Sequence, residues 1–202
     1  MLRYGLTGGI SSGKSTVAAL LRERGFPVLE ADKISHALIE PGGAAYGEVV
    51  ALFGREILNG DGRIDRARLG AIVFADRQKL DQLNGIIHPR VESELVRQLS
   101  ELEKSRRYAA AFVEAALIFE AGLHKKLDGV LVAWCLPEQQ LARLMERGMS
   151  EAEARQRMAM QMPVQEKLAL AEEKIDCSGS MEETRRQVDA LAARLRAASP
   201  AV

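Results

Sequence analysis

One short stretch constrains this chain more than any other, Gly8-Gly9-Ile10-Ser11-Ser12-Gly13-Lys14-Ser15, which fits the pattern G-x-x-x-x-G-K-[ST]. It lies between a short apolar run, Arg3 to Leu6, and an apolar helical pattern that stops at Gly25. A strand, a glycine-rich turn and a helix in this order direct several backbone N–H groups at one point. The stretch therefore predicts a phosphate-binding loop and the binding of a nucleoside triphosphate.

The residue types in the loop suit this chemistry. Lys14 is placed to reach the β and γ phosphates, and the Ser15 hydroxyl suits a Mg²⁺ ion that bridges them. The alternative is a plain glycine-rich turn before a helix, but the flanking strand and helix patterns favour the phosphate loop. The residues expected to bind ATP here are Gly9, Ile10, Ser11, Ser12, Gly13, Lys14, Ser15 and Thr16.

Composition narrows the class of protein. Lys plus Arg equals Asp plus Glu at 28 each, so we expect neither nucleic acid nor an anionic membrane as a partner. The two cysteines, Cys135 and Cys177, lack C-x-x-C spacing and are expected to be buried free thiols. Without a long apolar run or a cleavable leader, a cytoplasmic protein is expected. We expect a monomer and leave a homo-oligomer open.

Strand-like and helical patterns alternate along the chain, which predicts an α/β fold with a five-stranded parallel sheet flanked by helices. The second and third strands are too far apart for one crossover, so we expect extra helices there, as an inserted substrate subdomain over about residues 33–107. The nucleotide-binding core is expected over about 1–32, 108–142 and 163–202. The expected strands are Arg3–Leu6, Pro27–Glu30, Ala110–Glu114, Gly129–Cys135 and Lys174–Cys177.

Within the insertion, His88-Pro89 is expected to start a helix that packs on the sheet. His88 would then be a cap or packing residue, with substrate contact as the alternative. The apolar positions of this helix recur at helical spacing, at Val91, Leu95, Leu99 and Leu102.

A second helical segment, from Leu136 to Met162, is rich in arginine and divided at Gly148. It predicts a mobile lid over about residues 143–162, because arginines that close over a phosphoryl group stabilise its charge and exclude water. For any single arginine, an exposed helix with Glu–Arg pairs is an equally good interpretation. The arginines are Arg143, Arg147, Arg155 and Arg157.

Three carboxylates lie at or just after the ends of expected strands. Asp32 should lie at the carboxyl end of the sheet, where it could accept the proton of an attacking hydroxyl. The alternative role for Asp32 is the N-cap of a helix that starts at Lys33. Glu30 is the rival base, and Glu114 could orient a water bound to Mg²⁺.

Taken together, the motifs resemble the dephospho-CoA kinase family, which is related in fold to the nucleoside monophosphate kinases, over nearly the whole chain. The order and spacing of the stretches are more specific than the phosphate loop alone. They are Leu6–Thr16, Glu30–Asp32, Asp61–Arg66 with Leu69, Val73 and Phe74, Ile87–Pro89, Leu117–Glu120, Arg143 and Leu144 with Arg147, Arg157 and Gln161, and Ile175–Asp176.

The resemblance implies that the γ-phosphoryl group of ATP is transferred to the ribose 3′-hydroxyl of dephospho-CoA, giving CoA. It implies Asp32 as the base, Lys14 and Arg143 as further catalytic residues, and Arg143 and Arg147 as ATP contacts. Mg²⁺ would be held by Ser15, with Glu114 acting through a water. The implied substrate-binding residues are Asp32, His88, Leu117, Ile118, Phe119, Glu120 and Arg157.

The chain departs from the usual family pattern at several positions. Ser11 replaces a glycine, which costs little if its φ is negative and much if its φ is positive. Cys177 replaces an asparagine and cannot reproduce the paired hydrogen bonds of an amide to adenine. Glu30 and Glu114 replace aspartates, which leaves the Mg²⁺ ligands open, and Ala116 replaces a proline.

Two other functions stay open from the residues alone. One is a kinase of the same fold with another acceptor, such as a nucleoside monophosphate, which a panel of acceptors would identify. The other is a nucleotide-binding switch, whose hydrolysis would not depend on an acceptor. The sequence has no guanine-reading N-K-x-D pattern and no long exposed apolar stripe to favour the switch.

Overall fold

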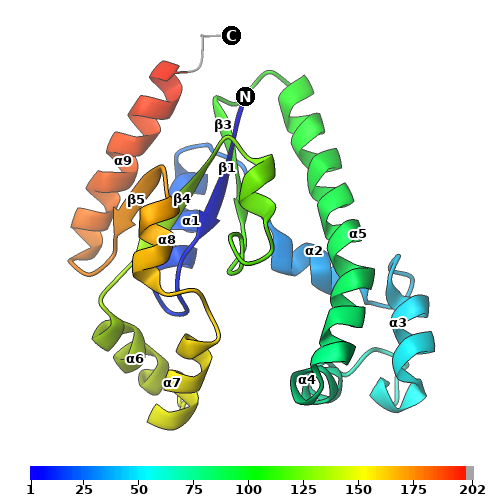
Figure 1. Ribbon diagram of the computed structural model, residues 1–202. Coiled ribbons are helices and arrows are strands. Elements are labelled where there is room, and N and C mark those ends of the chain that lie inside the picture. Colours follow the sequence, from blue (N-terminus) through cyan, green and yellow to red (C-terminus); the bar gives the residue numbers. More distant parts are fainter. Residues whose placement is uncertain (199–202) are drawn as a thin grey trace. The chain divides into compact units, whose positions relative to one another are not determined.

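A computed structural model describes residues 1–198 and contains a five-stranded parallel sheet in the order β2-β3-β1-β4-β5 (Figure 1). β1 pairs with both β3 and β4, so the strand before the glycine-rich loop is central. All five predicted strands are confirmed, with ends that differ by no more than one residue. They are β1 (Leu2–Thr7), β2 (Val28–Glu30), β3 (Ala110–Glu114), β4 (Gly129–Trp134) and β5 (Glu173–Asp176).

The chain divides into two compact units. The first comprises residues 1–29 and 101–198 and contains most of the sheet. Its helices are α1 (Lys14–Glu23), α6 (Pro137–Glu146), α7 (Glu151–Ala159), α8 (Val164–Leu170) and α9 (Met181–Ala198). The second, Glu30–Ser100, contains α2 (Ala31–Leu38), α3 (Tyr46–Phe53), α4 (Arg66–Ala75) and most of α5 (Arg77–Lys104). The predicted extra helices between the second and third strands are therefore confirmed. Short 3₁₀ turns occur at Arg55–Ile57 and Leu123–Lys126.

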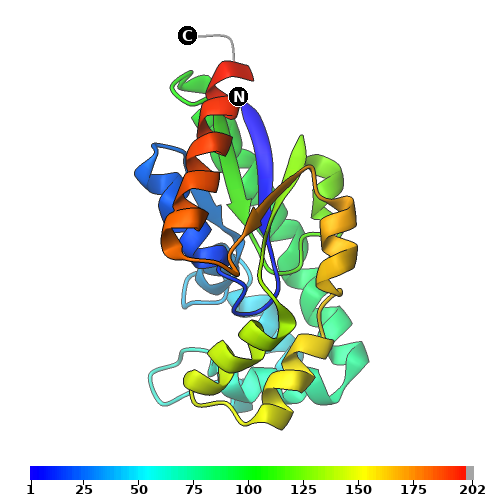
Figure 2. The same cartoon turned by 90° about the vertical axis from the view of Figure 1, so that its left-hand side faces the viewer.

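The sheet of the first unit is buried on both faces, as a parallel sheet requires. Along β4, Leu131 and Ala133 join the core that α1 and α9 cover, whereas Val130 and Val132 face a second core with Ile118. This alternation follows from the two-residue period of a strand. Figure 2 shows α9 and α8 on opposite sides of β5. The loop after β1 is thus fixed at its base by closely packed strands.

The second unit has a hydrophobic core of its own, to which each of α3, α4 and α5 contributes buried side chains. α4 begins at an N-cap, Asp65, whose carboxylate accepts hydrogen bonds from the N–H groups of Ala67 and Arg68. The core residues include Ile39, Val49, Phe53, Ile57, Leu69, Val73, Leu83 and Ile86.

The predicted helix start at His88-Pro89 is wrong, because α5 begins at Arg77 and continues through both residues. Asp76 caps its start by accepting bonds from the N–H groups of Gln78 and Lys79. A proline inside a helix costs about 3 kcal/mol. Burial on both sides of the proline offsets this cost, because one helix presents Leu83, Ile86, Ile87, Leu95 and Leu99 to the interior. His88 is exposed and neither caps nor packs.

Among residues 1–198, no helix combines the length and the apolar character that a bilayer crossing requires.

The aromatic centre of the first core should dominate the stability of its unit. Phe112 is fully buried, and its ring contacts those of Tyr4 and Phe26 at centroid distances of 5.9 Å. We expect Phe112→Ala to lower the free energy of unfolding by about 3–5 kcal/mol in urea titrations. Phe74→Ala is the matched control, because Phe74 is 70% exposed and its loss should change stability little. Equal effects of the two substitutions would contradict this assignment of the core.

Candidate functional site

The glycine-rich loop owes its shape to two of its glycines. At Gly8, a Cβ atom would lie 2.2 Å from the carbonyl oxygen of Ala133, so no side chain fits against β4. Gly13 has a φ of +99° and directly precedes α1, at a conformation that favours glycine. The N–H groups at the start of α1 are therefore presented to the loop, which makes an anion site at the positive end of a helix.

The loop lines a cleft of about 300 Å³, which we call the loop cleft. It brings together every residue predicted to bind ATP from Gly9 to Thr16, together with Arg147. Backbone N–H groups, a lysine and an arginine converge on this cleft, so it suits an anionic ligand. Its lining residues are Gly8, Gly9, Ile10, Ser11, Ser12, Gly13, Lys14, Ser15, Thr16, Ala116, Arg147 and Gln161.

Lys14 is held by a carboxylate from the neighbouring strand. Its Nζ atom lies 2.8 Å from Oε1 of Glu114, which is the last residue of β3 and is 8% exposed. Arg22 lies 3.9 Å from the other carboxylate oxygen. The predicted site residues Lys14 and Glu114 are therefore in direct contact.

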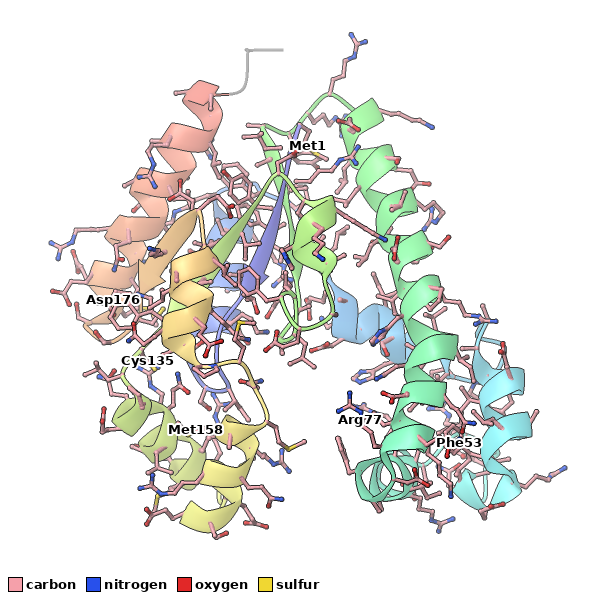
Figure 3. The ribbon with its side chains drawn as sticks, in the orientation of Figure 1. Met1, Phe53, Arg77, Cys135, Met158 and Asp176 are labelled. Carbon is pink, nitrogen blue, oxygen red and sulfur yellow. The ribbon has the colours of Figure 1, made fainter. Side chains whose placement is uncertain are left out.

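Arg143 connects the loop to the ends of β4 and β5. One guanidinium nitrogen donates to the carbonyl oxygen of Ser11 at 3.1 Å, and the other donates to that of Cys177 at 3.0 Å. Figure 3 labels Asp176, the last residue of β5, and Cys135, the residue that follows β4. Arg143 thus fixes the position of the loop.

A second cleft, of about 250 Å³, shares Ser11, Gly13 and Thr16 with the loop cleft, and we call it the side cleft. Arg147 lines both clefts, whereas Lys14 and Ser15 line the loop cleft alone. A long ligand with an anionic end could therefore extend across the loop. The side cleft is lined by Ser11, Gly13, Thr16, Arg143, Arg147, Cys177, Gly179, Met181 and Thr184.

Both cysteines are buried and free, as predicted. A Cβ atom added to Gly13 would lie 2.8 Å from the Cβ atom of Cys177, so this cysteine packs directly against the loop. Burial raises the pKa of the Cys135 thiol, and it raises the pKa of Cys177 to about 11. Cys177 is therefore a neutral packing group at neutral pH.

The segment after β3 divides between core and surface. Ile118 is fully buried and Phe119 is 6% exposed, and both pack against Val130 and Val132. The core encloses both side chains, and a substrate contact by these two residues stays a prediction. Leu117 is 47% exposed and is available to a ligand.

Glu120 belongs to a network that sequence reasoning missed. Its Oε1 atom lies 3.0 Å from Nζ of Lys167, which is fully buried, and accepts a hydrogen bond from the N–H of Met162. Lys167 also donates to the carbonyl oxygen of Ala116 at 3.0 Å. The network ties the segment after β3 to the segment between α7 and α8. No sequence signal distinguished this lysine from a surface one.

The predicted residues of the second unit lie on two helices. Asp32 is exposed in the first turn of α2. The N-cap position belongs to Glu30, so the alternative role of Asp32 as an N-cap is wrong. Glu30 pairs with Lys33 at 3.0 Å. His88 is exposed on α5.

The two short helices predicted for the lid are confirmed as α6 and α7, with Gly148 at a φ of +88° between them. Arg155 pairs with Glu151 at 2.7 Å, as expected if this helix is an exposed one with Glu–Arg pairs. Arg157 is exposed on the same helix. Gln161, which follows α7, lines the loop cleft, although only its place in the family pattern singled it out.

Ser11 occupies the position where a glycine is usual, and its φ is +57°. A non-glycine residue in this region is strained by about 1–2 kcal/mol. We therefore expect Ser11→Gly to be more stable than Ser11→Ala by about 1 kcal/mol, the reverse of the ordinary order, in urea unfolding. The same pair of substitutions at Ser12, whose φ is not positive, is the control and should keep the ordinary order. A more stable alanine at position 11 would contradict the strain.

The Glu120–Lys167 pair should make stability depend on pH. Burial alone raises the pKa of Glu120, but the N–H groups of Glu120 and Met162 and the Lys167 ammonium bring the pKa below its usual 4.5. Because the pKa is lower in the folded state, the stabilisation is complete above pH 4.5 and is lost as the pH falls through the folded value.

We expect Glu120→Gln to lower the free energy of unfolding by about 1–3 kcal/mol at pH 7, and by less at pH 4. Urea titrations at several pH values would measure this. Glu166→Gln, at an exposed neighbouring glutamate of α8, should change stability by less than about 0.5 kcal/mol. A difference between wild type and Glu120→Gln that stays constant with pH would refute the ion pair.

Comparisons with known proteins agree with this geometry. The family model for dephospho-CoA kinase matches residues 2–183. Dephospho-CoA kinases of Shouchella clausii and Geobacillus kaustophilus are 45% and 46% identical, over 95% and 94% of this chain and 98% and 94% of their own. The crystal structure of a Thermus thermophilus protein matches at 36% identity with a TM-score of 0.82, over 96% of this chain and 97% of that one.

A dephospho-CoA kinase from Campylobacter jejuni matches in structure as well, with a TM-score of 0.73 at 29% identity over 96% of each chain. The matches span the sheet, the glycine-rich loop and the helices between the second and third strands. The chain therefore belongs to the dephospho-CoA kinase family.

Proposed function

We propose that this chain transfers the γ-phosphoryl group of ATP to the 3′-hydroxyl of the ribose of dephospho-CoA, giving CoA and ADP. The observation that carries the proposal is the loop cleft, where backbone N–H groups converge with Lys14 and Arg147. Membership of the family supplies the identity of the acceptor.

The donor groups of the loop cleft account for the phosphate end of ATP. Lys14 would neutralise the negative charge on the oxygens of the β and γ phosphates. Its ammonium, which now pairs with Oε1 of Glu114, would pair with phosphate oxygen instead. Arg147 lines both clefts and would contact the phosphate chain where it crosses the loop. Arg143 would act from beside the loop, where the Ser11 and Cys177 carbonyl oxygens hold it. Charge neutralisation and alignment are the main sources of catalysis in such transfers.

Mg²⁺ fits the oxygen donors at the same place. When bound, the ion would supply positive charge that helps to neutralise the transferring phosphoryl group. The Ser15 hydroxyl would hold the ion, and Glu114 would reach it through a water. In residues 1–198, no group of three His, Cys, Asp or Glu side chains is placed to hold a metal by itself, so phosphate oxygens would complete the set of ligands.

Asp32 is the proposed base. As the acceptor oxygen forms its bond to the γ phosphorus, the bond to the bridging oxygen breaks and ADP leaves. The proton of the 3′-hydroxyl passes to the Asp32 carboxylate, which is exposed at the start of α2. The proposed contacts of the acceptor include the exposed residues His88, Leu117, Glu120 and Arg157. Ile118 and Phe119, beside Leu117, complete the proposed set.

We also propose that the protein acts as a cytoplasmic monomer on these two small molecules. The balance of 28 basic and 28 acidic residues supports the absence of a nucleic-acid partner. Light scattering on the purified protein would test the monomer.

Substitution of Asp32 tests the role of the base. We expect Asp32→Asn to lower kcat at least about a hundredfold and to leave the affinity for ATP within a few fold, because the amide cannot accept the proton. Lys33→Gln, at the neighbouring exposed position, is the control for a general disturbance of α2. A kcat near that of the wild type would remove Asp32 from this role.

A panel of acceptors tests the reaction itself. ADP release should exceed the background with water when dephospho-CoA is supplied, and should not exceed it with CMP or UMP. Release with CMP or UMP but not with dephospho-CoA would indicate a kinase for nucleoside monophosphates. Release that is the same with and without any acceptor would indicate a nucleotide-binding switch.

A further inference from the structure

Gln161 contacts the phosphate loop from the end of the lid. Its Oε1 atom accepts a hydrogen bond from the backbone N–H of Ile10 at 2.8 Å. Because a backbone N–H only donates, the side-chain oxygen must face the loop and the amide nitrogen must be the other end. The contact therefore sets the orientation of the Gln161 amide.

The nitrogen end of this amide carries two N–H donors that have no hydrogen-bond partner in the part of the chain that the structure describes. Gln161 lines the loop cleft, and the charged side chains on that cleft, Lys14 and Arg147, are both cations. Gln161 is only partly buried, so water can satisfy these donors in the open cleft, and an oxygen of a ligand can take the place of that water. The N–H donors and the two cations of the loop cleft favour a ligand with anionic oxygens.

The two clefts indicate which part of a triphosphate Gln161 meets. Ile10, Lys14, Ser15 and Gln161 line the loop cleft and not the side cleft. The lysine of such a loop reaches the β and γ phosphates. The outer phosphates therefore belong in the loop cleft, with Gln161, and the nucleoside end belongs toward the side cleft.

We propose that Gln161 is a phosphate-positioning residue that distinguishes ATP from ADP. Its oxygen is held by the Ile10 N–H, and its nitrogen donates a hydrogen bond to an oxygen of the outermost phosphate. This inference rests on ATP as the phosphoryl donor in the proposed function.

The chain next to Gln161 is anchored, which allows the side chain to act with precision. The following residue, Met162, donates its N–H to Glu120 at 3.0 Å, and Glu120 is held by the fully buried Lys167. Gln161 is thereby held at two points, at the loop through its side-chain oxygen and at the segment after β3 through the backbone of Met162.

The test compares the affinities of two nucleotides. Gln161→Glu keeps an oxygen for the Ile10 N–H but replaces the donor nitrogen with a second carboxylate oxygen. Calorimetry in the presence of Mg²⁺ would measure both dissociation constants. The Kd of ATP should rise at least about tenfold, and the Kd of ADP should change less than about threefold. Only ATP has the outermost phosphate, so only ATP loses the hydrogen bond from the Gln161 nitrogen. Gln156→Glu adds the same charge at an exposed position of α7 and should leave both constants within about twofold.

The ratio of the two dissociation constants decides the outcome. If Gln161→Glu keeps the wild-type ratio, the residue is structural and the inference is overturned. Tighter ATP binding by Gln161→Ala would also overturn it, because the side chain would then compete with phosphate for the Ile10 N–H. If Gln161→Glu does not fold, Gln161→Met removes the donor nitrogen without adding a charge, although it also removes the acceptor for the Ile10 N–H, and the Kd of ATP should again rise more than that of ADP. Wild-type protein that binds ATP but does not phosphorylate dephospho-CoA would defeat the proposed function and leave this inference standing.

Discussion

The turn of the backbone between β1 and α1 is the constraint on which the rest of the site depends. Gly8 passes so close to the carbonyl oxygen of Ala133 that any side chain would collide with β4. Gly13 then takes a left-handed conformation that starts the helix. Since β1 lies between β3 and β4, the turn is fixed by neighbours on both sides. A loop on a rigid base can present its N–H groups to an anion without reorganising.

The strands that fix the loop also supply its chemical partners. β3 ends in Glu114, which binds Lys14, and the ends of β4 and β5 lead to Cys135 and Cys177. Arg143 donates to the carbonyl oxygen of Ser11 in the loop, to that of Cys177 after β5 and to the sulfur of Cys135 after β4. The site is therefore assembled at the carboxyl edge of the sheet, as expected for an open parallel α/β fold.

The sequence predicted the features that depend on neighbours in the chain. Short apolar runs marked the strands, and the loop motif marked the residues that line the loop cleft. Contacts between residues that are distant in the chain were not predictable in this way. Gln161 and Ile10 are 151 residues apart, and only folding brings Lys167 into contact with Glu120. Pro89 was misread because local propensity favours a helix start, whereas burial on both sides keeps α5 continuous.

Cys177 gives the loop a built-in chemical reporter. With a pKa of about 11, its thiol is ionised in only about one molecule in ten thousand at pH 7, and it is 6% exposed. Alkylating reagents attack the thiolate, so modification must await a local opening that exposes the sulfur to water. The rate of alkylation at this cysteine would therefore measure how often the end of β5 separates from the glycine-rich turn.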